Sequence, residues 1–204
     1  LCYDDLKDDN PRLIHAHGTG WGDVGPESHK PGYDTVCYFA RSGFEQTVFP
    51  FEGWLAHFPP GAGDQPSGVA LFSAIMMALY RRERTGKGMR VSTSLLANGA
   101  WANACLLTAK AIGAEFLEKR PRHNAHNFIA LHYRAADDGL FRLTIVDVER
   151  DWPKFCRAID REQLIDDPRF CEPVVRREHM STLIGILDQR FAEEPRAHWL
   201  TRLE

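Results

Sequence analysis

The chain has 204 residues, of which 44% are hydrophobic and 26% charged, and its formal net charge is −3. This length and balance are typical of one or two globular domains with a core of their own. The negative net charge argues against a surface dedicated to nucleic acid, so we expect no nucleic-acid partner. The cysteines form no CxxC pair and the histidines no HExxH motif, which predicts reduced thiols in a cytoplasmic setting and no metal site.

Membrane association is not expected either. The longest apolar run, from Val69 to Tyr80, is too short to cross a bilayer, and no signal peptide opens the chain. The chain lacks an initiator Met and stops abruptly at Glu204, which is typical of a fragment cut at both ends.

The first half of the chain alternates strands and helices. Hydrophobic periodicity and end signals predict helices over 4–10, 33–42, 66–84 and 95–112, and strands over 12–16 and 90–93. The helix over 66–84 has the strongest pattern, since it is apolar nearly all round and ends in a cationic turn before Gly86. We therefore expect it to be a buried helix. Ser94 is expected to cap the helix that follows it.

The second half has a different pattern. Residues 113–127 are polar and carry Pro121, which indicates a connecting segment. Beyond it, strands over 128–134 and 140–146 are predicted to form a hairpin, followed by helices over 151–159, 176–191 and 195–203. An alternating first half and a hairpin with helices in the second predict an α/β protein with a second, smaller unit.

Asp64 stands out because glycines lie on both sides of it and a helix follows directly. The common role of such a residue is the helix N-cap. The alternative is a nucleophilic carboxylate. Flanking glycines would let an acyl thioester approach the backbone, and free N–H groups at the helix start would stabilise a developing oxyanion. The local residues do not decide between these roles.

Several motifs occur in a fixed order along the chain. They are Leu6-x5-Arg12-Leu13-Ile14, Gly20-Trp21-Gly22-x2-Gly25-Pro26, Lys30-Pro31-Gly32-Tyr33-Asp34, Gly63-Asp64, Arg82-x2-Thr85-Gly86-Lys87-Gly88-x2-Val91-x2-Ser94-Leu95, and Asp166-Asp167-Pro168-Arg169-Phe170. This ordered set spans essentially the whole chain. It resembles the family III CoA-transferases, which include formyl-CoA, carnitine and aryl-acid CoA-transferases and the α-methylacyl-CoA racemases.

The resemblance implies a fold and an assembly. The fold is α/β, with an open parallel-sheet, Rossmann-like large domain and a smaller α+β domain, and the full-length protein forms an interlocked homodimer. Residues 1–113 would then be the central part of the large domain, 114–127 a linker, and 128–204 an incomplete small domain.

The resemblance also implies that Asp64 is the catalytic nucleophile. Asp64 would attack the thioester of a donor acyl-CoA, giving a mixed anhydride and CoA thiolate, and the thiolate would convert the anhydride into an aspartyl-CoA thioester. The carboxylate of an acceptor acid would then open that thioester. The expected partners are an acyl-CoA, which brings coenzyme A as part of the substrate, and a small carboxylic acid. Exchange of a thioester for a carboxylate needs no metal.

A coenzyme site is implied at Lys30, Gly32, Tyr33 and Asp34, which match a family loop that lies along the CoA arm. The alternative is a proline-glycine turn that Asp34 caps before a helix.

Two departures favour a transferase over the racemase branch. Tyr33 stands where racemases carry a His, and with an ordinary pKa of about 10 a tyrosine is a poor base for an α-proton. Pro60 replaces an Asn that is usual in racemases. A racemase or epimerase, and a truncated family member without catalysis, remain the alternatives.

Two further groups of residues have both a functional and a structural interpretation. Arg122, His123 and His126 belong either to an acyl pocket or to a polar linker. Five aromatic residues form either an apolar wall beside Asp64 or ordinary loop anchors; they are Trp21, Phe49, Phe51, Trp54 and Phe58.

Overall fold

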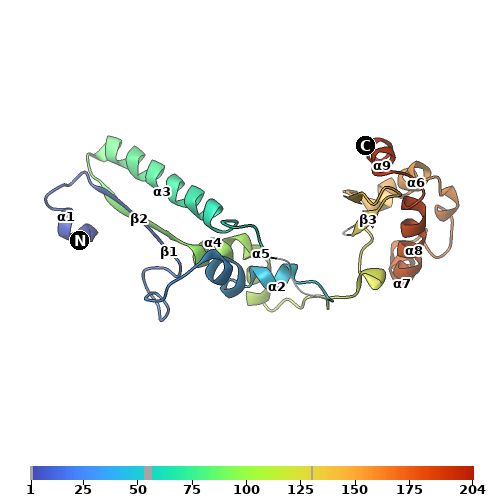
Figure 1. The fold of residues 1–204 in the computed structure, drawn as a ribbon, viewed down its shortest axis with the longest axis horizontal. Helices are drawn as coiled ribbons and strands as arrows, with labels where there is room; N and C mark the ends of the chain where they lie inside the picture. The colour runs from blue at the N-terminus through green and yellow to red at the C-terminus, as the bar shows by residue number, and fades with distance from the viewer. Residues whose placement is uncertain (1, 53–56, 130) are drawn as a thin grey trace. The chain divides into compact units, whose positions relative to one another are not determined.

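The computed structural model describes residues 2–52, 57–129 and 131–204. The chain divides into two compact units, Leu1–Leu117 and Glu118–Glu204, which are described separately (Figure 1). In the described ranges, no helix is both long enough and apolar enough to cross a membrane.

The first unit is built on two parallel strands, β1 (Ile14–Thr19) and β2 (Met89–Ser94), which pair in register from Ile14↔Met89 to Thr19↔Ser94. Parallel strands require a crossover connection. Here the crossover carries the π-helix η1 (Thr35–Arg41), α2 (Phe44–Val48) and α3 (Asp64–Thr85) (Figure 1). A short helix, α1 (Tyr3–Leu6), precedes β1. The predicted mixed α/β class is confirmed.

Helix α3 is longer than the predicted 66–84, and it ends as expected at Gly86, whose positive φ of 72° lets its N–H bond Arg82 O at 2.8 Å. The expectation that α3 is buried all round is wrong. Four of its large apolar side chains are between 59% and 67% exposed: Val69, Phe72, Met77 and Tyr80. The helix packs on one side of a two-stranded sheet, and no described residue covers its other side.

The π-helix η1 lies in close contact with two glycines. A Cβ added to Gly63 would lie 2.8 Å from both Asp34 Cβ and Tyr38 Cβ, and one added to Gly99 would lie 2.1 Å from Tyr38 O. Any larger side chain at either position would push η1 away from the start of α3 or from the middle of α4. The helix predicted over 33–42 is present over the shorter range Thr35–Arg41, in the rare π geometry that is frequent at functional sites.

The predicted helix over 95–112 is wrong as one element, because it is two helices, α4 (Leu95–Ala102) and α5 (Ala104–Ala111). The break is at Asn103, which is buried and donates from Nδ2 to Ser42 O at 3.4 Å. Ser94 caps α4 as predicted, since its Oγ accepts from Ala97 N at 3.1 Å. The break therefore joins these helices to the end of η1.

The second unit contains the predicted hairpin, formed by antiparallel β3 (His132–Arg134) and β4 (Leu140–Arg142). Its helical elements are η2 (Arg122–Asn124), α6 (Val148–Ala158), η3 (Glu162–Leu164), α7 (Pro173–Glu178), α8 (Met180–Phe191) and α9 (Arg196–Arg202). The predicted helix over 176–191 is wrong as one element, because α7 ends and α8 begins at His179.

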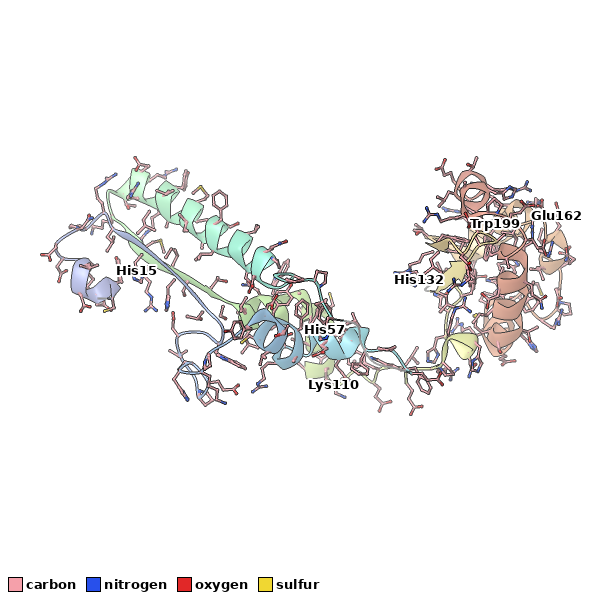
Figure 2. All side chains as sticks on the ribbon, in the orientation of Figure 1. His15, His57, Lys110, His132, Glu162 and Trp199 are labelled. Atoms are coloured by element: carbon pink, nitrogen blue, oxygen red, sulfur yellow. The ribbon has the colours of Figure 1, made fainter. Side chains whose placement is uncertain are left out.

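Trp199 of α9 lies fully buried in the core of this unit (Figure 2). The guanidinium of Arg190, itself 6% exposed, stacks over its ring with 4.6 Å between Cζ and the ring centroid. Arg190 Nε donates to Ile159 O at 2.7 Å, and its terminal nitrogens pair with Asp160 and Glu193 at 2.7 and 2.8 Å. A buried charge is stable here because each edge of the guanidinium has an acceptor.

A prediction concerns the close approach at Gly63. Gly63→Ala places its methyl group inside contact distance of η1 and should destabilise the chain by about 1–3 kcal/mol. The control is Gly68→Ala in the same helix, where an added Cβ meets nothing within 4 Å. That substitution should stabilise α3 by about 0.5–1 kcal/mol. Urea unfolding followed by circular dichroism measures both, and equal midpoints for the two variants would contradict the packing described.

A second prediction concerns the thiols. All five cysteines are free; Cys2, Cys105 and Cys171 are exposed, whereas Cys37 and Cys156 are buried. Burial raises the pKa of the Cys156 thiol to about 12 and also raises the pKa of Cys37. Because only the thiolate attacks disulfide reagents, the exposed thiols should react in the native chain and the buried ones only after denaturation. Mass mapping of the labelled peptides checks this, and rapid native labelling of Cys156 would refute it.

Candidate functional site

Asp64 is the first residue of α3, and the N-cap position belongs to Gly63. The interpretation of Asp64 as the N-cap is therefore wrong by one residue. The Asp64 side chain is exposed, and no described residue donates a hydrogen bond to its carboxylate. The exposed Asp64 side chain stands at the start of a 22-residue helix, where the helix dipole favours negative charge.

The backbone immediately before Asp64 is held at both of its polar groups. Gly63 N donates to Asp34 Oδ2 at 3.1 Å, and Gly63 O accepts from Ser67 Oγ at 2.8 Å. Gly63, Asp34 and Ser67 are all buried. Gly63 is thus buried with both backbone polar groups hydrogen-bonded, whereas the Asp64 side chain that follows it is exposed and accepts no hydrogen bond from a described residue.

Most N–H groups around the start of α3 are occupied. Gln65 N bonds Gly61 O at 2.9 Å, Gly63 N bonds Asp34, and Pro66 has no N–H. The expectation of several free donors is therefore wrong. Within the described ranges, the N–H of Asp64 itself is the one that remains without a partner, so a single donor is available to an oxyanion at this position.

Asp34 uses both of its carboxylate oxygens and is 9% exposed. Oδ1 accepts from Thr35 N at 2.8 Å, which makes Asp34 the N-cap of η1, and Oδ2 reaches Gly63. The interpretation of Asp34 as a helix cap is confirmed, while its contact with CoA stays a prediction. No sequence signal points to the bond with Gly63, because 29 residues separate the two.

The loop that was predicted to hold CoA crosses the preceding glycine-rich loop. A Cβ on Gly32 would lie 2.9 Å from Gly20 Cα, and Trp21 Nε1 donates to Pro31 O at 3.0 Å. Tyr33 follows this crossing and is 75% exposed. The crossing fixes the backbone on which the Tyr33 ring is presented to solvent.

Lys30 lies on the same loop in an ion pair with Glu27 at 3.0 Å, and Glu27 also pairs with Arg41 at 3.0 Å. These two cations hold the pKa of Glu27 below its usual value. Lys30 is half exposed, so a ligand phosphate would compete with Glu27 for its ammonium group.

Two of the five aromatic residues considered as a wall beside Asp64 make anchoring contacts. Phe58 stacks on Phe39 of η1 with 3.8 Å between ring centroids, and Trp21 is hydrogen-bonded to the backbone of Pro31. Phe51 is about half exposed, and Trp54 lies outside the described residues. Loop anchoring is the role that the described contacts of Phe58 and Trp21 support.

Arg122 holds the second unit together. Its two terminal nitrogens bond both carboxylate oxygens of Asp188 at 2.7 Å, and its Nε and one terminal nitrogen also donate to His132 O. The bond to Asp188 raises the pKa of Arg122. His126 Nε2 lies 2.8 Å from Glu118 O. These contacts engage the Arg122 guanidinium and one ring nitrogen of His126 within the second unit, which supports a structural role for both residues.

The strands β1 and β2 bring together a polar cluster that no sequence motif predicts. Asp23 accepts from Arg90 at 2.6 Å and pairs with His17 at 3.0 Å, and His15 lies opposite Arg90 in the β1–β2 register. The alternation of β1 places His15 and His17 on one face of the sheet. No motif links these residues, because the strands that bring them together are far apart in sequence.

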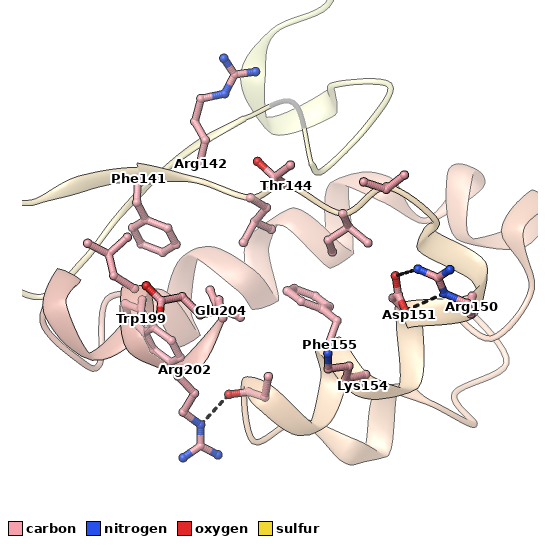
Figure 3. A pocket seen from close by; sticks show the side chains of 16 residues that line it. Phe141, Arg142, Thr144, Arg150, Asp151, Lys154, Phe155, Trp199, Arg202 and Glu204 are labelled. Atoms are coloured by element: carbon pink, nitrogen blue, oxygen red, sulfur yellow. Dashed lines mark hydrogen bonds and ion pairs between the residues drawn. The ribbon is translucent and has the colours of Figure 1, made fainter.

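The second unit contains a cavity of about 450 Å³ (Figure 3). Phe141, Phe155 and Trp199 line it, together with the Arg150–Asp151 ion pair at 2.7 Å. It contains none of the site residues predicted from the sequence. Among the residues that the structure describes, no group of three His, Cys, Asp or Glu side chains is placed to hold a metal ion.

Known proteins match this chain over its whole length. The sequence profile of CoA-transferase family III matches residues 1–204. The (R)-2-hydroxy-4-methylpentanoate CoA-transferase of Clostridioides difficile is 30% identical over 100% of this chain and 51% of its own length. The acetyl-CoA:oxalate CoA-transferase of Acetobacter aceti is 32% identical over 97% of this chain and 50% of its own length.

The fold has solved counterparts. A CAIB/BAIF family protein from Brucella suis superposes with a TM-score of 0.82 at 25% identity, covering 100% of this chain and 53% of the other. Rv3272 from Mycobacterium tuberculosis gives a TM-score of 0.79 at 28% identity, covering 100% and 52%. The chain thus spans about half the length of the relatives it matches. It belongs to CoA-transferase family III.

Proposed function

We propose that the full-length protein transfers coenzyme A from an acyl-CoA to a small carboxylic acid through an aspartyl-CoA thioester on Asp64. The observation that carries this proposal is the Asp64 carboxylate, which is exposed and free of hydrogen bonds from described residues on a fixed backbone. Among the described residues, no donor engages the lone pairs of this nucleophile.

The reaction begins when one Asp64 oxygen attacks the thioester carbon. A C–O bond forms, the C–S bond breaks, and CoA leaves as the thiolate. The thiolate then attacks the Asp64 carbonyl carbon of the mixed anhydride, which releases the donor acid and leaves CoA on Asp64. The acceptor carboxylate attacks this thioester and the steps run in reverse. The N–H of Asp64 and the helix dipole are placed to stabilise negative charge at these stages.

The coenzyme contacts are proposed at Lys30, Gly32 and Tyr33. Tyr33 is exposed next to a fixed glycine crossing, and Lys30 offers an ammonium group to a phosphate of the coenzyme. The names of the relatives include a 2-hydroxy acid and a dicarboxylic acid among their substrates, which supports a small carboxylic acid as the acceptor class. The interlocked homodimer and the cytoplasmic location stay predictions.

Asp64 should be trapped by hydroxylamine. The full-length protein is mixed with hydroxylamine and, in turn, three acyl-CoAs. Acetyl-CoA occurs in the name of the Acetobacter aceti relative, and succinyl-CoA and cinnamoyl-CoA occur in the names of two further matched CoA-transferases, from Mus musculus and Clostridium sporogenes. We expect a hydroxamate on the peptide that contains Asp64, because hydroxylamine attacks both the anhydride and the thioester. Mass spectrometry of the digested protein detects it.

The matched control is Asp23→Ala, which removes another partly exposed carboxylate of the first unit. It should leave the label in place, whereas Asp64→Ala should abolish it. Absence of label with every donor would refute the nucleophile. Deuterium incorporation at the α-carbon of the acyl group without coenzyme exchange would instead support a racemase.

A further inference from the structure

Gly63, the residue directly before Asp64, must be small enough to pack against η1 and yet rigid enough to hold Asp64 in place. It must be glycine, because a Cβ there would collide with Asp34 and Tyr38. Glycine, however, has more backbone freedom than any other residue. Without restraint, rotation about the φ and ψ bonds of Gly63 would move the Asp64 side chain.

The Asp34 carboxylate supplies the restraint. Capping η1 requires one oxygen, and Oδ1 does this through Thr35 N. The other oxygen reaches across 29 residues to Gly63 N at 3.1 Å. Ser67 holds the carbonyl of the same residue, so both rotatable bonds of Gly63 are limited from its two ends.

The surroundings make this restraint rigid. Tyr38 packs against Gly63 on one side and meets Gly99 with its carbonyl on the other. Ser42 Oγ donates to Tyr38 O, and Asn103 donates to Ser42 O. The position of Asp34 is therefore set also by α4 and Asn103 through η1, and not only by its own loop.

From this geometry we infer that Asp34 is a positioning residue, which holds Gly63 N–H and thereby places the Asp64 carboxylate for attack on the acyl carbon. The inference rests on the proposed role of Asp64. It gives Asp34 a different function from the coenzyme contact that the family resemblance implies, and the two functions make different kinetic predictions.

The test uses the full-length protein with Asp34→Ala and Asp34→Asn. At saturating acyl-CoA, Asp34→Ala should lower the rate of Asp64 hydroxamate formation by about 100-fold, because misplacement by about 1 Å costs this much. The KM for acyl-CoA should not change. Asp34→Asn keeps one acceptor oxygen and should lose less. If Asp34→Ala loses its helical circular dichroism, Asp34→Asn carries the comparison.

Hydrogen exchange at the Gly63 amide provides a second measurement, which does not depend on the reaction of Asp64. It should accelerate in both Asp34 variants relative to wild type. The control is Asp147→Ala, which removes a carboxylate that caps α6 through Arg150 N at 3.1 Å. It should alter neither Gly63 exchange nor the labelling rate.

The outcomes separate the two proposals. Wild-type label on Asp64 with an unchanged rate in Asp34→Ala would overturn the positioning role alone, as would unchanged exchange at Gly63. A raised KM with an unchanged saturating rate would overturn it in favour of a coenzyme contact. Absence of label in wild type would overturn the role of Asp64, and the positioning role for this reaction with it.

Discussion

The first unit depends on one buried carboxylate that bonds two backbone segments. Asp34 follows a glycine-rich loop, caps η1 and bonds Gly63, the N-cap residue of α3. A hydrogen bond to a charged group contributes about 1.5–3 kcal/mol. This corresponds to about a tenfold to hundredfold preference for the bonded arrangement. Gly63 has no side chain, so the start of α3 can pack directly against Asp34 and Tyr38. Loss of either partner would leave the other buried without compensation.

The site combines a fixed backbone with an unrestrained side chain. Structural carboxylates in this chain are bonded, as the Asp188 carboxylate is by Arg122 and the Asp23 carboxylate by Arg90 and His17. Asp64 differs from them, since the described residues give its oxygens no donor. A carboxylate that stabilises the fold and one that reacts have opposite needs. A carboxylate that stabilises the fold has its oxygens hydrogen-bonded. A carboxylate that reacts needs free lone pairs and a defined position.

Local signals predicted much of the structure. The glycine stop of α3, the Ser94 cap and the turn between β3 and β4 are each determined by a few adjacent residues, and all are present. The choice of Asp64 also depended on its local setting and on the resemblance to a family.

What could not be predicted depends on contacts between distant segments. Asn103, at the break between α4 and α5, bonds Ser42, and Asp34 bonds Gly63 across 29 residues. The error about α3 has the same origin. An apolar pattern shows that a helix face avoids water, but the extent of its burial depends on how many strands and helices lie around it.

The apolar face of α3 has a practical consequence for work with this polypeptide. Val69, Phe72, Met77 and Tyr80 lie at helical spacing and are largely open to water. A continuous surface of this kind favours self-association and capture by chaperones. Preparations of the 204-residue chain should accordingly aggregate more as concentration and salt rise, and mild detergent should keep them dispersed.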